Sequence, residues 1–246
     1  MVFPLPSMTT CRIAVLAGGG IGPEVVNESF KVRQTVETKL HEVRFTFEHC
    51  SVGAGECLKN GDPLPASALE RVQACDAIPL GAMGLPSVRW PSGVEMTPQI
   101  DIREKPDLYY GVRPIKLHRE THSPFKGYGG AGGKPVDFVV IRENCEGLFS
   151  EWLTSRPAGR DHETDTMKIT RRGAERVCRE AFKLSCSRRQ CCTLVDKANV
   201  LPSMAVLRKI VDEVAAIFFR TCGPTAFKSM RWRSSSCIAR TLSMRW

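Results

Sequence analysis

Two hydrophobic periods alternate along the chain. Apolar runs and apolar–polar alternation, which are typical of strands, occur at residues 12–17, 43–48, 76–82, 136–141 and 193–195. Segments that fit amphipathic helices, most clearly through apolar residues spaced by three and four, occur at residues 64–73, 174–184 and 202–216. Because strands alternate with helices, the pattern predicts an α/β fold in which helices cover a sheet.

Single residues refine the ends of these elements. Thr170 stands where the N-cap of the helix over 174–184 is expected. Pro23 and Glu24 suit the first turn of a helix after the first strand, since proline is tolerated there and an acid favours the positive end of the helix dipole. Pro79 fits poorly in a central strand, because proline removes a donor from the ladder.

The last thirty residues, 217–246, follow neither period. They contain six Lys or Arg and no Asp or Glu, which leaves a net charge of only +3 from the chain's +9 for the rest. Two interpretations stay open: a basic arm that binds nucleic acid nonspecifically, with Trp232 and Trp246 among its cations, or a foreign segment such as translation in another reading frame yields. We do not expect nucleic acid to be a partner of the remaining chain.

Composition also bears on whether the chain is a membrane protein or a disulfide-bonded protein. No run of about 18 apolar residues is present, which excludes a membrane span. The eleven cysteines form no CxxC pair, and their odd number argues against a complete disulfide framework. We expect reduced thiols in a cytoplasmic protein, where each cysteine serves as a small apolar side chain.

A glycine-rich turn, GGGIG at residues 18–22, follows the first predicted strand. Glycines let a backbone approach a phosphate closely, and the start of the following helix favours an anion. Glu48, near the end of the second predicted strand, could then bind a ribose. The spacing departs from GxGxxG, however, and a tight strand-to-helix turn explains the same residues.

Four cations stand at informative positions. Arg103 and Arg113 lie in the segment DIREKPDLYYGVRPIK, and Arg142 ends the run VDFVVIR. Three guanidinium groups in one cleft would bind a substrate with two or more carboxylates, whereas separate surface cations are the simpler alternative. Lys197, at the end of a predicted strand, would be either a general base or a solvated lysine.

Seven blocks, in order over residues 11–216, resemble the NAD-dependent β-decarboxylating dehydrogenases of the isocitrate/isopropylmalate dehydrogenase family. They are RIAVLAGGGIGPEVV, GDPLP, CDAIPLGAMGLPSVRWPSGVEMTPQIDIRE, PDLYYGVRP, VDFVVIRENCEGLFSE, MKITRRGAERV and LVDKANVLPSM. GAMGLP and ENCEGLF are most similar to the tartrate and isopropylmalate branch. The resemblance implies a two-domain α/β fold and a reaction in which NAD oxidises a 2-hydroxy dicarboxylic acid, whose β-carboxyl leaves as CO₂ with help from Mg²⁺ or Mn²⁺.

The resemblance also implies roles for individual residues. Arg103, Arg113 and Arg142 match the arginines that hold the substrate carboxylates. Lys197 matches the lysine that assists proton removal from the substrate hydroxyl, and the family donates this lysine across a homodimer interface. The residues matched near the nicotinamide are Glu95 and Asn199.

Departures from the family pattern affect what this chain can do. Gly19 replaces an acid, and Phe149 replaces a tyrosine whose hydroxyl reprotonates the enol. The family's metal-binding aspartates and its adenosine-binding loop have no counterpart in the sequence. We therefore expect an N-terminal piece of such an enzyme without turnover of its own, or a non-catalytic frameshifted or truncated product.

This interpretation divides the chain into three parts. Residues 9–108 are expected to be the first half of a discontinuous cofactor-side domain. Residues 109–216 are expected to be an incomplete dimer-forming domain, and residues 217–246 a basic segment foreign to the family.

Overall fold

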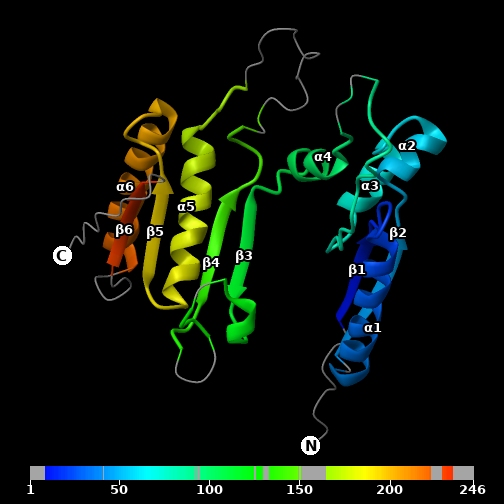
Figure 1. Cartoon of the computed structure of the whole chain (residues 1–246), viewed down its shortest axis with the longest axis horizontal. Coiled ribbons are helices and arrows are strands. Elements are labelled where there is room, and N and C mark those ends of the chain that lie inside the picture. The colour runs from blue at the N-terminus through cyan, green and yellow to red at the C-terminus, as the bar shows by residue number, and fades with distance from the viewer. Residues whose placement is uncertain are drawn as a thin grey trace, which may run out of the picture. The chain divides into compact units, whose positions relative to one another are not determined.

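The computed structural model describes residues 9–40, 42–91, 93, 95–124, 126–129, 133–148, 150, 165–222 and 229–234. The chain divides into two compact units, Met1–Pro106 and Asp107–Trp246, each with its own hydrophobic core. Both units combine strands with helices, which confirms the α/β class (Figure 1). The cofactor-side and dimer-forming roles assigned to the two parts stay predictions.

The first unit begins with a parallel βαβ motif. β1 (Thr9–Val15) and β2 (Val43–His49) pair in parallel, and α1 (Gly22–Leu40) connects them (Figure 1). A crossover of this kind is required, since a tight turn cannot join parallel neighbours. Three short helices follow: α2 (Ala54–Asn60), α3 (Ala66–Gln73) and α4 (Pro98–Glu104).

The first strand is covered on both faces. Ile13 and Val15 pack in a cluster with Val26 of α1, whereas Ala14 and the next residue, Leu16, belong to a second cluster on the other side. A parallel strand buried on both faces appears in the sequence as a continuous apolar run. This explains why residues 12–17 show no alternation.

The strand predicted over 76–82 is wrong, because this segment meets β1 only through isolated parallel bridges. The bridges are Ile13–Ala77 and Leu16–Leu80. Pro79 has no N–H to donate and so interrupts the ladder, although its carbonyl still accepts a hydrogen bond from Leu16 N at 3.1 Å.

Glu48, near the end of β2, ties three elements of the first unit together. Its carboxylate accepts hydrogen bonds from Arg71 Nε of α3 at 2.6 Å and from Arg12 Nη2 of β1 at 3.3 Å. Arg71 also donates to the His49 carbonyl at 2.9 Å. The hydrogen bond from Arg71 is the main reason why the pKa of Glu48 lies below its usual value of 4.5.

The second unit contains two strand pairs and two long helices. Its elements, in chain order, are β3 (Tyr110–Lys116), the 3₁₀ turn η1 (Glu120–His122), β4 (Asp137–Glu143), α5 (Arg171–Cys186), β5 (Cys191–Asp196), α6 (Pro202–Cys222) and β6 (Ser229–Ser234). β3 pairs with β4 antiparallel, and β5 pairs with β6 in parallel. α5 contacts β4, β5 and α6, and so links the two strand pairs (Figure 1).

The two long helices enclose the core of the second unit. Phe182 of α5 and Ile210 and Val214 of α6 are almost completely buried there. Thr170 is the predicted N-cap of α5: its hydroxyl accepts a hydrogen bond from Gly173 N at 3.1 Å. The helices predicted over 174–184 and 202–216 are therefore confirmed as α5 and α6.

The prediction that residues 217–246 lack regular structure is wrong for two segments. α6 continues to Cys222, six residues beyond Ala216, and β6 forms at Ser229–Ser234. The missed part of α6 shows no clear period in the sequence, but it continues a helix that packs against the core. Trp246, invoked for the nucleic-acid hypothesis, lies outside the described residues.

Two further findings concern membrane spans and thiols. Within the described residues, no helix is long and apolar enough to cross a membrane. Nine of the cysteines in the described part of the chain are free thiols. Burial raises the pKa of Cys178 to about 12 and that of Cys192 to about 11, so both stay protonated at neutral pH and act as apolar side chains.

Replacing Glu48 with Gln should destabilise the chain near pH 7, and the effect should shrink as the pH falls. Because the folded-state pKa of Glu48 is lowered, its contribution to stability is present above the unfolded pKa near 4.5 and is lost as the pH falls through the lower folded value. The measurement is the difference in Tm between the wild type and Glu48→Gln from pH 7 to pH 3. A difference that stays constant over this range contradicts the role of the ionised carboxylate.

Candidate functional site

The β3–β4 pair brings two of the predicted substrate-binding arginines to one face. In the antiparallel register Gly111 pairs with Arg142, and Arg113 pairs with Val140. Residues directly opposite each other share a face, as do residues two apart on one strand. Arg113 and Arg142 therefore project from the same face as diagonal neighbours, about 7–8 Å apart and within reach of long side chains.

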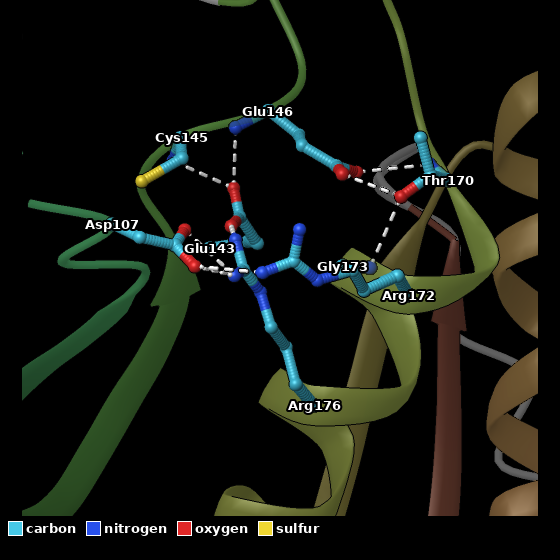
Figure 2. Close-up of polar contacts among 8 residues, drawn as sticks. All are labelled: Asp107, Glu143, Cys145, Glu146, Thr170, Arg172, Gly173 and Arg176. Carbon is cyan, nitrogen blue, oxygen red and sulfur yellow. Dashed lines mark hydrogen bonds and ion pairs between the residues drawn. The ribbon is translucent and has the colours of Figure 1, made fainter. Parts of the chain in front are cut away.

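Arg176 of α5 holds the end of this strand pair at which Arg142 stands. Its Nη1 donates to both carboxylate oxygens of Asp107, at 2.7 and 2.6 Å, and its Nη2 donates to Glu143 Oε1 at 2.9 Å (Figure 2). The guanidinium also lies over the Tyr109 ring, 4.1 Å from the centroid. Asp107 precedes β3 and Glu143 ends β4, so one side chain clamps both strands.

Glu143 and Glu146 organise the loop that follows β4. Glu143 Oε2 accepts hydrogen bonds from Cys145 N at 2.7 Å and from Glu146 N at 2.5 Å (Figure 2). The Glu146 carboxylate in turn accepts from Thr170 N at 2.9 Å and from the Thr170 hydroxyl. A Cβ on Gly173 would lie only 2.4 Å from Glu146 Oε2, so glycine makes room for this contact at the start of α5.

Lys197 and Asn199 follow β5 in a loop that a buried acid supports. Asp196, only 3% exposed, accepts hydrogen bonds from Arg208 Nε of α6 at 2.9 Å and from Ala198 N at 3.1 Å. Asp196 is the last residue of β5, and Lys197 follows it directly at the start of the loop. Lys197 is half-buried and Asn199 is exposed.

The other predicted site residues are distributed differently. Arg103 lies in α4 of the first unit, where its Nε donates to Gln99 O at 2.9 Å. Glu95 is exposed in the same unit, with its carboxylate 4.0 Å from Arg89 Nη1. Phe149, which replaces the family tyrosine, lies outside the described residues. Arg113 thus shares a face with Arg142, and Lys197 shares a loop with Asn199, while Arg103 and Glu95 belong to the other unit.

The glycine-rich turn is packed by the protein's own backbone. A Cβ on Gly18 would lie 1.9 Å from Ala82 O, and a Cβ on Gly22 would lie 2.1 Å from Ala17 O. Gly18 also has a φ of +75°, which side chains other than glycine rarely adopt. These contacts favour the tight strand-to-helix turn over a phosphate site, and the proposed ribose acid, Glu48, is already held by two arginines.

The described residues do not form a metal site by themselves. Among them, no group of three or more His, Cys, Asp or Glu side chains could hold a metal ion. The two residues matched to the nicotinamide, Glu95 and Asn199, belong to different units. The described side chains therefore form no acidic cluster for Mg²⁺ or Mn²⁺.

Sequence reasoning missed Arg176 and its acidic partners. One signal was available, since Arg172 and Arg176 stand one helical turn apart and share a face of α5. That spacing indicates that acids face the helix but cannot identify them, because Asp107 and Glu143 lie 69 and 33 residues away from Arg176 along the chain.

Fold and site together define an α/β protein of two units with paired arginines on a two-stranded antiparallel ribbon. The family described as isocitrate/isopropylmalate dehydrogenase matches residues 12–223. The 3-isopropylmalate dehydrogenase of Thermotoga maritima is 40% identical over 215 residues, and that of Corynebacterium efficiens is 38% identical over 207. The chain belongs to the isocitrate/isopropylmalate dehydrogenase family, as the sequence motifs indicated.

The matches cover this chain more fully than they cover its relatives. Each of these two alignments covers 83% of the chain but 58% of the relative, so the chain spans less than two thirds of their length. The family match ends at residue 223, seven residues beyond the predicted limit at 216, and thus includes the continuation of α6.

Solved structures show the same fold. A β-decarboxylating dehydrogenase from Thermococcus kodakarensis superposes with a TM-score of 0.61 at 28% identity, covering 91% of this chain and 64% of that one. An isocitrate dehydrogenase from Methylococcus capsulatus gives a TM-score of 0.68 at 24% identity, covering 92% of this chain and 67% of that one.

Replacing Arg176 with Met should destabilise the second unit by about 1–3 kcal/mol, because Glu143 would lose its charged partner in a site shielded from water. The Arg176 and Glu143 side chains are only 17% and 16% exposed. Arg172→Met is the matched control: Arg172 also contacts Asp107, at 3.0 Å, but is 81% exposed, so the loss should stay within about 0.5 kcal/mol. Denaturant unfolding measures both, and equal losses would contradict the clamp.

Proposed function

We propose that the chain binds a 2-hydroxy dicarboxylic acid of the isopropylmalate, tartrate or D-malate type, as part of an NAD-dependent dehydrogenase that decarboxylates it oxidatively. The shared face of Arg113 and Arg142 carries the proposal. Guanidinium groups have donors and no acceptor, so two of them on one face suit an anion with several carboxylate oxygens. Family membership supports the reaction class.

Each predicted residue has a distinct part in this proposal. Arg103, Arg113 and Arg142 bind the carboxylates of the substrate. Lys197 assists removal of the proton from the 2-hydroxyl group, for which its amine must be unprotonated. The residues proposed on the nicotinamide side are Glu95 and Asn199.

The remaining components are proposed from the family alone. NAD would supply the hydride acceptor, and Mg²⁺ or Mn²⁺ the Lewis acid that polarises the resulting ketone. We also propose a homodimer in which Lys197 serves the partner chain. Large apolar side chains beside Lys197 support this, since Val195 and Val200 are each 63% exposed and such groups are typical of surfaces that another chain covers.

Replacing either Arg113 or Arg142 with Gln should weaken the binding of D-malate to the 246-residue chain about tenfold or more. Each substitution removes charge-assisted hydrogen bonds to a carboxylate, which contribute about 1.5–3 kcal/mol. A chemical-shift titration by NMR gives the Kd and shows at the same time that the variant is folded.

Lys116→Gln is the matched control for this titration. Lys116 lies on the same strand, β3, but at a position that alternates to the opposite face from Arg113. Its loss should leave the Kd within a factor of two. Equal weakening by all three substitutions would point to nonspecific attraction of the anion rather than to a site.

We expect no NADH formation by the 246-residue chain alone with D-malate, tartrate or isopropylmalate, in the presence of Mg²⁺ or Mn²⁺. The described residues contain no metal-binding cluster, and the sequence has no counterpart of the family's adenosine-binding loop. The absorbance of NADH measures turnover, with the Thermotoga maritima relative as the positive control. NADH production above the protein-free background contradicts the expectation.

A further inference from the structure

Asn144 places an amide group on the face that Arg113 and Arg142 share. Gly111 pairs with Arg142 and stands two residues before Arg113, so the Cβ that Gly111 lacks would point to this same face. An ideal Cβ there would lie 2.6 Å from Asn144 Nδ2 and 2.9 Å from Asn144 Oδ1. The amide therefore fills the space above Gly111, next to both arginines.

The position of Asn144 is fixed, but its oxygen lacks a partner. Asn144 N donates to Tyr109 O at 3.0 Å, and the preceding residue, Glu143, is held by Arg176. Oδ1 is buried and has no hydrogen-bond partner among the described residues, although the side chain as a whole is only half-buried. A buried acceptor without a donor is unfavourable, and a half-turn about χ2 exchanges Oδ1 with Nδ2 in the same space.

The chemistry of the face shows which ligand group this oxygen suits. The arginines offer only donors, and a carboxylate offers only acceptors. In a dicarboxylic acid with two hydroxyl groups, Lys197 is proposed to take the proton of the 2-hydroxyl group. The second hydroxyl group therefore needs another acceptor for its proton. An acceptor beside the carboxylate-binding arginines matches that second hydroxyl.

We infer that Asn144 is a specificity-determining residue, whose amide oxygen accepts a hydrogen bond from the 3-hydroxyl of a 2,3-dihydroxy dicarboxylic acid such as tartrate. The inference rests on the proposed function and narrows its substrate class. At the same carbon, a hydrogen atom, as in D-malate, leaves the amide oxygen unpaired. An isopropyl group brings an apolar surface against it.

Tartrate and D-malate differ by the one hydroxyl group that Asn144 is inferred to bind, so the ratio of their Kd values tests the inference. NMR titrations of the 246-residue chain with D-malate and with each stereoisomer of tartrate should show one tartrate binding about tenfold tighter than D-malate. Asn144→Leu should reduce this ratio to about one and leave the Kd for D-malate within a factor of two. Gln34→Leu, an exposed amide on α1, should leave both values unchanged.

The Asn144→Asp variant distinguishes the effect of losing the hydrogen-bond acceptor from the effect of a change in packing. The carboxylate keeps an acceptor but repels dianions, so both affinities should fall while the preference for tartrate persists. Equal binding of tartrate and D-malate by the wild type, or an unchanged ratio in Asn144→Leu, overturns the inference and leaves the proposed function standing. Failure of the folded wild type to bind either acid overturns both.

Discussion

The antiparallel register of β3 and β4 is the constraint on which the candidate site depends. A slip of one residue would move every side chain of one strand to the other face. Arg113 would then point away from Arg142, and Gly111 would no longer make room for the Asn144 amide. Two strands of seven residues, neither of which contains a fully buried residue, do not specify such a register strongly by themselves.

Arg176 of α5, which lies outside the strand pair, helps to fix the register of β3 and β4. It binds Asp107 before β3 and Glu143 at the end of β4 at the same time, and these two contacts together favour the observed alignment of the two strands. Partly buried ion pairs add little net stability, because the cost of desolvation offsets most of the attraction. The value of this cluster therefore lies in selecting one register and in fixing the loop that carries Asn144, rather than in the free energy of unfolding alone.

The sequence predicts the local features of this fold well and its distant contacts poorly. The strands at residues 12–17 and 43–48 and the Thr170 cap depend on neighbours along the chain, and each appears where expected. The strand at 76–82 fails because Pro79 outweighs the apolar pattern around it. Arg103, Arg113 and Arg142 were grouped by spacing and resemblance, but the shared face of Arg113 and Arg142 follows from a register that spacing does not encode.

The same arrangement of residues occurs around Arg142, at the end of β4, and around Lys197, directly after β5. At the end of β4 the acid Glu143 binds an arginine of the following helix, and the adjacent Arg142 faces the proposed ligand. At the end of β5 the acid Asp196 binds Arg208 of the following helix, and the adjacent residue is Lys197.

At the end of β4, neighbouring strand residues point to opposite faces, so Glu143 anchors the backbone while Arg142 stays on the other side. At the end of β5, Asp196 anchors the backbone directly before Lys197. At both strand ends the acid positions the backbone, and the neighbouring cation is the residue proposed to contact the ligand. A change in the cation proposed to face the ligand should leave its anchor in place, whereas loss of an anchor should displace the cation without removing its charge. The residues that sequence motifs emphasise are the cations; the helix arginines that hold them in place become visible only in three dimensions.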